Sequence, residues 1–160
     1  MELRIGQGID IHPFAVGRPL VLGGVKIPHE SGLAGHSDAD ALLHALIDAL
    51  LGAAGLADIG ALFPDSDIQW KGADSAVLLR KAWAEVSKLG WRVVNVDATV
   101  LAEAPKLAPH REAMKKVITD ILGIELSCCG IKATTSEKLG FVGRKEGVLA
   151  SCVVLLQRGE

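Results

Sequence analysis

Cysteine is scarce in this sequence of 160 residues, and two of the three cysteines, Cys128 and Cys129, are adjacent. Because no Cys-x-x-Cys spacing occurs, neither a disulfide framework nor a site with thiolate ligands is predicted. We expect the cysteines to be small buried apolar residues and the protein to be cytoplasmic.

The sequence also lacks a long apolar run. The longest apolar stretch, residues 41–56, is interrupted by His44, Asp48 and glycines, and it is too short to span a membrane. Glu2 and Arg4 precede a strand-like pattern instead of the apolar core of a signal peptide. We therefore expect no membrane segment and no signal peptide.

Neither sign of charge dominates, because 17 basic and 19 acidic residues give a net charge of −2. A nucleic-acid partner is not predicted, since such proteins carry a basic surface. The P-loop pattern, the metalloprotease pattern H-E-x-x-H and a convincing Ser-His-Asp or Cys-His arrangement are all absent. The corresponding enzyme classes are therefore not indicated.

What the sequence does contain is the composition of an ordinary globular domain, with 49% hydrophobic and 22% charged residues. Residues 1–160 are predicted to form one domain, because this length is typical of a single core. The mean hydropathy of +0.34 is high for so small a protein. A small domain with more apolar residues than its own core can bury tends to bury the rest against another chain, so we expect a homo-oligomer.

Hydrophobic periodicity predicts an α+β domain with one mixed β-sheet packed against helices on one face. Strands are predicted at residues 3–11 and 20–27, which we expect to pair through a turn at residues 17–19. A buried helix is predicted to begin with Ser37 as its N-cap and to end near Ala53. After a loop at residues 58–69, the remaining predicted elements are a helix at 74–89, a strand at 92–102, a helix at 109–122 and strands at 127–134 and 147–156.

Asp10-Ile11-His12 is the first motif that indicates chemistry. Asp10 and His12 are predicted to lie on the same side of a strand, because successive side chains alternate. His44, inside the predicted helix, supplies a third candidate ligand. One carboxylate and two imidazoles form a set that Zn²⁺ accepts while leaving a position open for water or substrate. The alternative is an Asp that caps a turn and two histidines bonded to backbone carbonyls.

A histidine in so apolar a helix needs a polar partner. Asp40 and Asp48 lie four residues before and after His44, so either could face the imidazole along the helix. A carboxylate there would fix the tautomer of a metal-bound histidine, or it would satisfy a buried histidine without metal. His36 and Ser37 lie at the predicted helix N-terminus, which is compatible with a bound anion or with an ordinary N-cap.

Two loops are candidates for binding a nucleotide diphosphate. Residues 134–137 (TTSE) offer hydroxyls and backbone N–H groups for phosphate oxygens, and Glu137 could hold Mg²⁺ or Mn²⁺. Residues 102–107 (AEAPKL) follow a predicted strand, and their small side chains leave backbone groups accessible to a flat base. Taken singly, the first loop is also compatible with a simple turn and the second with a plain connector.

Four segments, read together, resemble the 2-C-methyl-D-erythritol 2,4-cyclodiphosphate synthase family of the non-mevalonate route to isoprenoid precursors. They are residues 4–12 (RIGQGIDIH), 36–46 (HSDADALLHAL), 58–65 (DIGALFPD) and 132–141 (KATTSEKLGF). The resemblance covers essentially the whole chain, in order and with matching spacing. It is therefore more specific than any single motif.

The resemblance implies a reaction in which the 2-phosphate of 4-diphosphocytidyl-2-C-methyl-D-erythritol 2-phosphate attacks the β-phosphate, closes a cyclic diphosphate and expels CMP. It implies a homotrimer with active sites between adjacent subunits. It also implies Zn²⁺ on Asp10, His12 and His44, and a second divalent ion, Mg²⁺ or Mn²⁺, near Glu137. Because the attacking group is already an anion, charge neutralisation and positioning by metal ions are what this chemistry needs.

Roles for other residues follow from the resemblance only. His36 and Thr135 would position and polarise the phosphates. Ser37 is implied to bind the substrate. The residues of the 58–67 loop implied to contact the erythritol and phosphate portion are Asp58, Gly60, Phe63, Pro64, Asp65, Ser66 and Asp67. The residues implied to bind cytosine are Ala102, Glu103, Ala104, Pro105, Lys106, Leu107 and Ala108. Further substrate contacts are implied at Thr134, Ser136, Phe141 and Arg144.

Two positions depart from the family pattern: Gln7 stands where many members carry His, and Ser136 where many carry Thr. Gln7 is predicted to face away from Asp10 and His12 on the strand. Ser136 keeps the hydroxyl, so the activity is still expected.

Two other functions stay open at this point. A zinc-dependent hydrolase would need a general base near the metal, and no motif supplies one. A homo-oligomeric binding protein for isoprenoid-like ligands would use the apolar excess together with Phe141 and Arg144. A separate hypothesis places an isoprenoid diphosphate at Arg144, near a trimer axis, as a feedback ligand.

Overall fold

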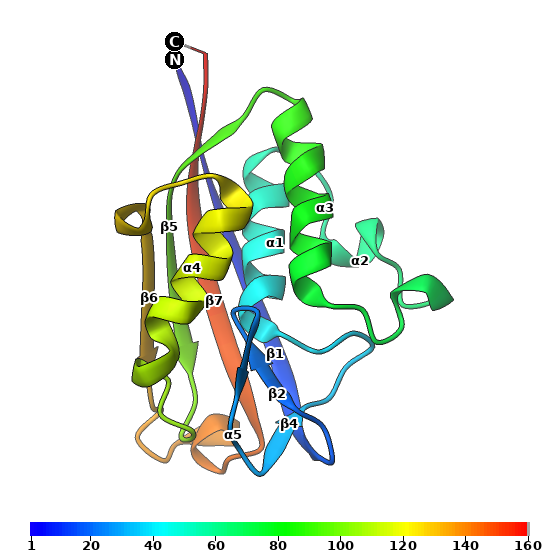
Figure 1. The fold of residues 1–160 in the computed structure, drawn as a ribbon, viewed down its shortest axis with the longest axis vertical. Coiled ribbons are helices and arrows are strands. Elements are labelled where there is room, and N and C mark those ends of the chain that lie inside the picture. The colour runs from blue at the N-terminus through cyan, green and yellow to red at the C-terminus, as the bar shows by residue number, and fades with distance from the viewer. Residues whose placement is uncertain (160) are drawn as a thin grey trace.

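Five strands form one mixed sheet, in the order β4-β1-β7-β5-β6 (Figure 1). Their bounds are Glu2–Val16 for β1, Ser31–Leu33 for β4, Arg92–Leu101 for β5, Cys129–Thr134 for β6 and Gly147–Arg158 for β7. The long central strands pair antiparallel, whereas β6 runs parallel to β5 at the edge. This is a computed structural model, and it describes residues 1–159.

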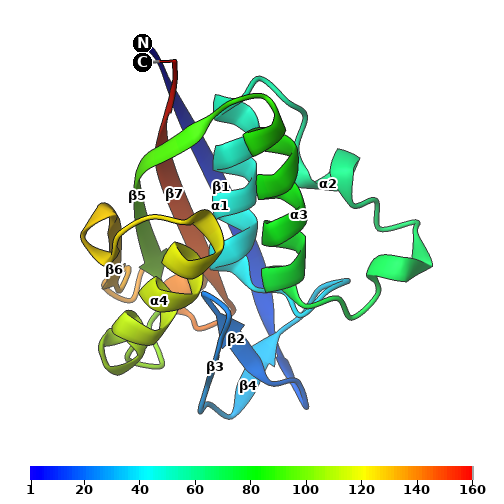
Figure 2. The same cartoon turned by 45° about the horizontal axis from the view of Figure 1, so that its top comes forward.

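The three longer helices cover the same face of this sheet, as the two views in Figures 1 and 2 show. They are α1 (Ala41–Ala53), α3 (Ser75–Lys88) and α4 (Arg111–Leu122). Single turns of helix occur at α2 (Ile59–Leu62) and α5 (Gly140–Gly143), and 3₁₀ turns at Ile68–Trp70, Ala108–His110 and Leu126–Cys128. The predicted α+β architecture is confirmed. No helix within residues 1–159 has the length and apolarity needed to cross a membrane.

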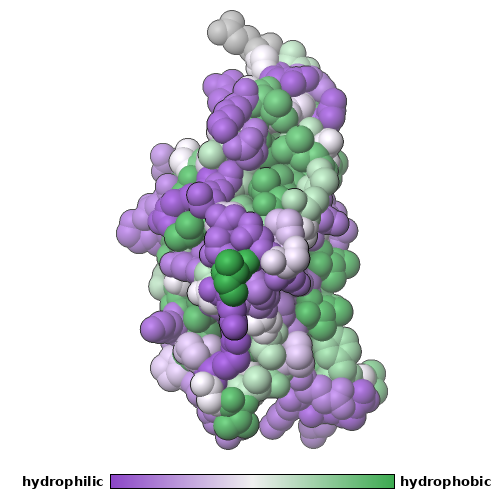
Figure 3. All heavy atoms as spheres, turned by 90° about the vertical axis from the view of Figure 1, so that its right-hand side faces the viewer, coloured by the Kyte–Doolittle hydropathy of each residue, from purple (hydrophilic) through white to green (hydrophobic). Residues whose placement is uncertain are grey.

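The core lies between the helices and one face of the sheet. Side chains alternate along β7, so that Ala150, Cys152 and Val154 are buried under the helices while Val153 is 42% exposed on the other side. The open face of the sheet carries further exposed apolar side chains on β1, namely Leu3, Ile5, Ile9 and Ile11. Apolar residues accordingly run along the right-hand edge of Figure 3, which is the back of the molecule in Figure 1.

Two glycines of β1 allow α1 to lie directly on the sheet. A Cβ at Gly6 would stand 1.9 Å from the backbone oxygen of Ala49, and a Cβ at Gly8 would stand 2.0 Å from that of Ala45. No side chain fits at either position, because these distances are far below van der Waals contact. Small residues therefore face each other where the helix lies on the strand.

The strand pairing near the N-terminus differs from the prediction. β1 pairs with β7 and β4, whereas residues 20–27 form a separate hairpin of β2 (Leu20–Leu22) and β3 (Val25–Ile27). The hairpin turns at Gly23 and Gly24, whose φ angles of +59° and +74° suit the tight two-residue turn that folds a short segment back on itself. The expected pairing of residues 3–11 with 20–27 was therefore wrong.

The start of α1 was also predicted incorrectly. Asp40, and not Ser37, is the N-cap, and its side chain accepts a hydrogen bond from Leu43 N. Ala39 has a φ of +58°, so the chain is not helical between Ser37 and Asp40. His36 and Ser37 therefore lie in the loop before the helix and not in its first turn.

Candidate metal centre and active site

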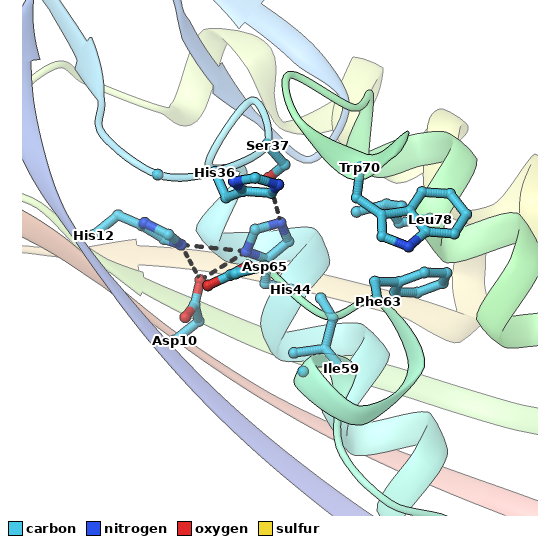
Figure 4. Close-up of a pocket in the computed structure, with 12 residues that line it drawn as sticks. Asp10, His12, His36, Ser37, His44, Ile59, Phe63, Asp65, Trp70 and Leu78 are labelled. Carbon is cyan, nitrogen blue, oxygen red and sulfur yellow. Dashed lines mark hydrogen bonds and ion pairs between the residues drawn. The ribbon is translucent and has the colours of Figure 1, made fainter. Parts of the chain in front are cut away.

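Three side chains from two elements converge at one point beside α1 (Figure 4). The Oδ2 atom of Asp10 lies 2.8 Å from His12 Nε2 and 3.2 Å from His44 Nδ1. The two histidine nitrogens are 3.2 Å apart. Asp10 and His12 alternate onto the helix-facing side of β1, as predicted, and α1 carries His44 to them.

The spacing of these three atoms fits a divalent cation. Nitrogen and oxygen ligands bonded at about 2.0–2.1 Å to a tetrahedral Zn²⁺ lie about 3.3 Å from one another. His12 Nδ1 is 2.7 Å from Ala34 O, so this nitrogen donates to the carbonyl and leaves Nε2 free to face the centre. The backbone contact therefore fixes the ring orientation that a ligand needs.

The charges of the cluster reinforce one another. Burial opposes ionisation of Asp10, but the adjacent imidazoles of His12 and His44 outweigh it and lower the pKa of the Asp10 carboxyl well below its usual range. Burial likewise opposes the charge on His12, yet the contact with Asp10 raises the pKa of that imidazole. A carboxylate that favours a positive partner in this way also favours a metal cation in the same place.

The polar partners of His44 are not the ones predicted. Asp40 caps α1, and Asp48 accepts a hydrogen bond from Ile59 N at 2.8 Å, so neither carboxylate contacts the imidazole. His44 Nε2 instead faces the hydroxyls of Ser37 at 3.1 Å and Ser75 at 2.9 Å. The helical spacing identified two nearby acids, but both are used by backbone N–H groups.

The three candidate ligands line a cavity of about 260 Å³. The other residues that line it are Gly35, His36, Ser37, Ile59, Gly60, Phe63, Asp65, Trp70 and Leu78. Its apolar wall contains Phe63 and Trp70, whose rings meet edge to face with centroids 5.0 Å apart. The Nε2 atom of His36 is buried and has no hydrogen-bond partner within residues 1–159. The cavity thus combines a cluster of candidate metal ligands with a free polar group.

The cavity brings together several of the residues that the sequence predicted for binding the erythritol and phosphates, including His36, Gly60 and Phe63. Other members of that set do not line it: Asp58 caps α2 by accepting from Ala61 N, and Asp67 caps the following 3₁₀ turn. Pro64 and Ser66 also lie outside the lining. Trp70 was not predicted, although an aromatic residue at the end of a polar loop was a usable signal.

A second cavity, of about 270 Å³, lies at the ends of β5 and β6. It joins the two loops that the sequence selected for a nucleotide, and it also includes Arg111, which was not predicted. The lining residues are Ala102, Glu103, Pro105, Lys106, Leu107, Ala108, Arg111, Ala133, Thr134 and Thr135. Ala104 lies in the same loop but outside the lining.

Glu103 connects the two loops of this second cavity. Its Oε1 atom accepts hydrogen bonds from Ser136 N at 3.1 Å, Ser136 Oγ at 3.2 Å and Lys138 N at 3.2 Å. Glu137 and Lys138 both have positive φ angles, 54° and 65°, in a loop that is exposed apart from the half-buried Ser136. The Glu103 carboxylate therefore holds a left-handed turn in place, and this turn presents Glu137.

The two cavities have no lining residue in common. In the described part of the chain, Glu137 belongs to no group of three potential metal ligands. Phe141 and Arg144 line neither cavity, and Arg144 pairs with Glu146 at 2.8 Å. Within one chain, the predicted site residues that line a cavity therefore fall into two separate groups.

Comparison with known proteins extends these observations. The chain matches the model of the YgbB family over residues 3–157. The 2-C-methyl-D-erythritol 2,4-cyclodiphosphate synthase of Neisseria gonorrhoeae is 60% identical over 157 residues, which are 98% of each chain.

Solved structures share the fold at substantial sequence identity. The bifunctional IspDF of Campylobacter jejuni superposes with a TM-score of 0.95 at 45% identity, covering 99% of this chain and 43% of that one. A CDP-bound 2C-methyl-D-erythritol-2,4-cyclodiphosphate synthase has a TM-score of 0.89 at 42% identity, covering 96% and 100%. The family that the sequence resembles is thereby confirmed, and the chain belongs to the YgbB family of 2-C-methyl-D-erythritol 2,4-cyclodiphosphate synthases.

Proposed function

We propose that this chain converts 4-diphosphocytidyl-2-C-methyl-D-erythritol 2-phosphate to 2-C-methyl-D-erythritol 2,4-cyclodiphosphate and CMP. An oxygen of the 2-phosphate attacks the β-phosphorus, and the bond from that phosphorus to the bridging oxygen of CMP breaks. The observation that carries the proposal is the convergence of Asp10, His12 and His44 on a cavity in a chain of this family.

The residues around the first cavity suit a reaction between two anions. We assign Zn²⁺ to the Asp10, His12 and His44 cluster, where it would neutralise phosphate charge and hold the reacting groups in line. His36 has a buried Nε2 atom without a partner, and this atom can donate a hydrogen bond to a phosphate oxygen. No side chain has to remove a proton, since the nucleophile is already a phosphate anion.

The apolar wall of the first cavity bears on the access of water to the reacting phosphorus. Phe63 and Trp70 present ring surface on which only the Nε1–H of Trp70 can bond a water molecule. Water that reached the β-phosphorus would give a linear product. We infer that this wall, together with the loop at residues 58–67, excludes water from the β-phosphorus during cyclisation.

We assign the cytidine and a second ion, Mg²⁺ or Mn²⁺, to the second cavity. Small and apolar residues of the 102–108 loop leave backbone groups accessible to a base, and Lys106 and Arg111 add positive charge near the phosphates. Thr135 lines the cavity, and Glu137 follows on the exposed turn. A CDP-bound structure of a relative supports a cytidine nucleotide as the ligand.

We propose a homotrimer that works in the cytoplasm, with each active site built from two subunits. The open face of the sheet supports association, because Leu3, Ile5, Ile9 and Ile11 are each at least half exposed there. The division of the site into two separate cavities supports a shared site, since a neighbouring copy can bring its nucleotide cavity to the metal centre.

The reaction can be tested with the purified protein, the diphosphocytidyl substrate and Zn²⁺ plus Mg²⁺. We expect equal amounts of CMP and the cyclic diphosphate, and loss of both products in His44→Ala. Release of CDP or of a linear phosphate instead would indicate a zinc-dependent hydrolase and overturn the proposal. Ligand binding without turnover would support a binding protein.

A further inference from the structure

His44 has a second set of contacts behind the metal centre. Its Nδ1 atom faces Asp10 and His12, whereas its Nε2 atom lies 3.1 Å from Ser37 Oγ and 2.9 Å from Ser75 Oγ. Ser75 is fully buried and is the first residue of α3. A metal can bind Nδ1 only when the ring proton is on Nε2.

The hydrogen bonds of Ser75 determine where that ring proton lies. Ser75 Oγ donates to the carboxylate of Asp38, which also accepts from Ser75 N at 3.0 Å. A carboxylate only accepts, so the hydroxyl proton of Ser75 is committed to Asp38. Ser75 Oγ is then left as an acceptor for Nε2–H of His44.

Ser37 alone would not make this selection. Its Oγ accepts from Ala39 N at 3.1 Å, and its own proton stays free to point toward His44 or away from it. With the opposite tautomer, Ser37 would donate to Nε2, and Nδ1 would carry the proton that blocks a metal. The pair of Ser75 and Asp38 therefore favours the proton on Nε2, against the Asp10 carboxylate, whose Oδ2 atom lies 3.2 Å from Nδ1.

We propose that Asp38 and Ser75 are positioning residues that hold His44 in the tautomer required for metal binding. The inference deepens the proposed function, because it concerns the same metal centre. Neither side chain lines the cavity, so both act through His44. A hydrogen-bonded partner on the distal nitrogen is what orients a histidine ligand in metal sites generally.

The same pair joins the metal centre to the loop that precedes α3. Asp38 N donates to Ala73 O at 3.0 Å, and Gly72 N donates to His36 O at 2.7 Å. These two hydrogen bonds join residues 36–38 to residues 72–73, just before Ser75 in the chain. A change at Ser75 is expected to loosen the metal centre and the loop that carries Trp70 at the same time.

The experiment measures zinc affinity in the assembled, metal-stripped protein by competition with a chelator, without substrate. Ser75→Ala removes the committed acceptor for Nε2–H and leaves only Ser37, which can also donate to Nε2, so we expect zinc to bind about 10- to 100-fold more weakly. Asp38→Asn replaces an acceptor with an amide that can donate to Ser75 Oγ. Ser75 would then donate its own proton to His44 Nε2, which favours the tautomer with the ring proton on Nδ1. We expect a loss of similar size in this variant of nearly identical shape.

Asp74→Ala is the matched control. Asp74 is the N-cap of α3 and accepts from Ala76 N at 2.8 Å, so this variant weakens the same helix start without touching His44. We expect its zinc affinity to stay within twofold of the parent protein. A purely structural role for Ser75 would instead give Asp74→Ala and Ser75→Ala the same loss.

The tautomer itself can be read from the ¹⁵N chemical shifts of the labelled imidazoles in the metal-free protein. We expect His44 of the parent protein to be protonated at Nε2, and Ser75→Ala and Asp38→Asn to shift toward Nδ1. Unchanged zinc affinity or an unchanged tautomer in both variants would overturn the inference. Failure of the proposed function would look different, because the parent protein would then bind zinc but form no cyclic product.

Discussion

Asp40 is a carboxylate without any exposed surface, and its three hydrogen bonds all come from backbone N–H groups. It accepts from Leu43 N at the start of α1, and from Gly23 N and Gly24 N of the β2–β3 hairpin. Burial raises the pKa of Asp40 to about 6, although the backbone hydrogen bonds act in the opposite direction. Asp40 therefore joins the start of α1 to the distant β2–β3 hairpin, and ionising this buried carboxyl lowers the stability of the folded protein.

This raised pKa predicts a particular pH dependence of stability. Between the ordinary value of 3.8 and about 6, folded Asp40 keeps a proton that the unfolded chain releases. The free energy of unfolding should therefore fall as the pH rises through this range, by about 3 kcal/mol in total. Urea denaturation of the parent protein and Asp40→Asn, at one fixed protein concentration and several pH values, isolates the contribution of Asp40. Parallel curves for the two proteins would contradict the raised pKa.

The contact between α1 and β1 depends on the absence of side chains at Gly6 and Gly8. The helix and the strand carry the candidate metal ligands, so their separation sets the distance from His44 to Asp10. Any outward shift of α1 opens the cluster, because the ligand atoms lie only about 3 Å apart.

Gly8→Ala tests this contact. Its Cβ would stand 2.0 Å from the Ala45 oxygen, so α1 has to move, and we expect a loss of about 2–4 kcal/mol in stability and weaker zinc binding. Gly52→Ala is the matched control, because Gly52 lies in α1 with open space around it. That change should stabilise the helix by about 0.5–1 kcal/mol and leave zinc binding unchanged. Equal effects of the two substitutions would show that α1 does not rest on Gly8.

The turn at residues 135–139 depends on Glu103 in a comparable way. Glu103→Ala removes the acceptor that holds Ser136 N and Lys138 N, so the left-handed turn at Glu137 loses its support. We expect several-fold faster amide hydrogen exchange in residues 136–138 and weaker binding of CDP. Glu103→Gln keeps one acceptor oxygen and should show a smaller change. Unaltered exchange in Glu103→Ala would mean that the turn is held by other contacts.

Local patterns predicted the elements whose signals are themselves local. The alternation of β1 placed Asp10 and His12 on one face, and the apolar run of α1 indicated a buried helix around His44. Pairing was not predictable in the same way, because β1 pairs with β7 from the opposite end of the chain and β4 has only three residues. The N-cap at Asp40 likewise depends on the hairpin turn some sixteen residues earlier, which no local pattern reveals.

At the scale of the whole molecule, one chain holds two separate cavities at different positions across the sheet. Asp10 pairs with Ala150, which pairs with Val100, which in turn pairs with Ala133. Three strand steps of about 4.8 Å therefore separate the metal cluster from the loop that leads to Thr135, about 14 Å in all. The exposed apolar residues of the open face favour association of the chains, and in the proposed homotrimer one subunit would bring its nucleotide cavity to the metal centre of the next.

A shared site predicts that two inactive variants restore each other. His44→Ala damages the metal centre and Thr135→Ala the nucleotide cavity, so each homotrimer should be almost inactive. When both chains are co-expressed, every trimer that contains both of them has one intact site among its three, because one pair of neighbours joins an undamaged metal centre to an undamaged nucleotide cavity. We therefore expect trimers isolated with two different affinity tags to recover a substantial part of the parent CMP release. A site contained within one chain would recover nothing, because every chain in the mixture carries one of the two defects.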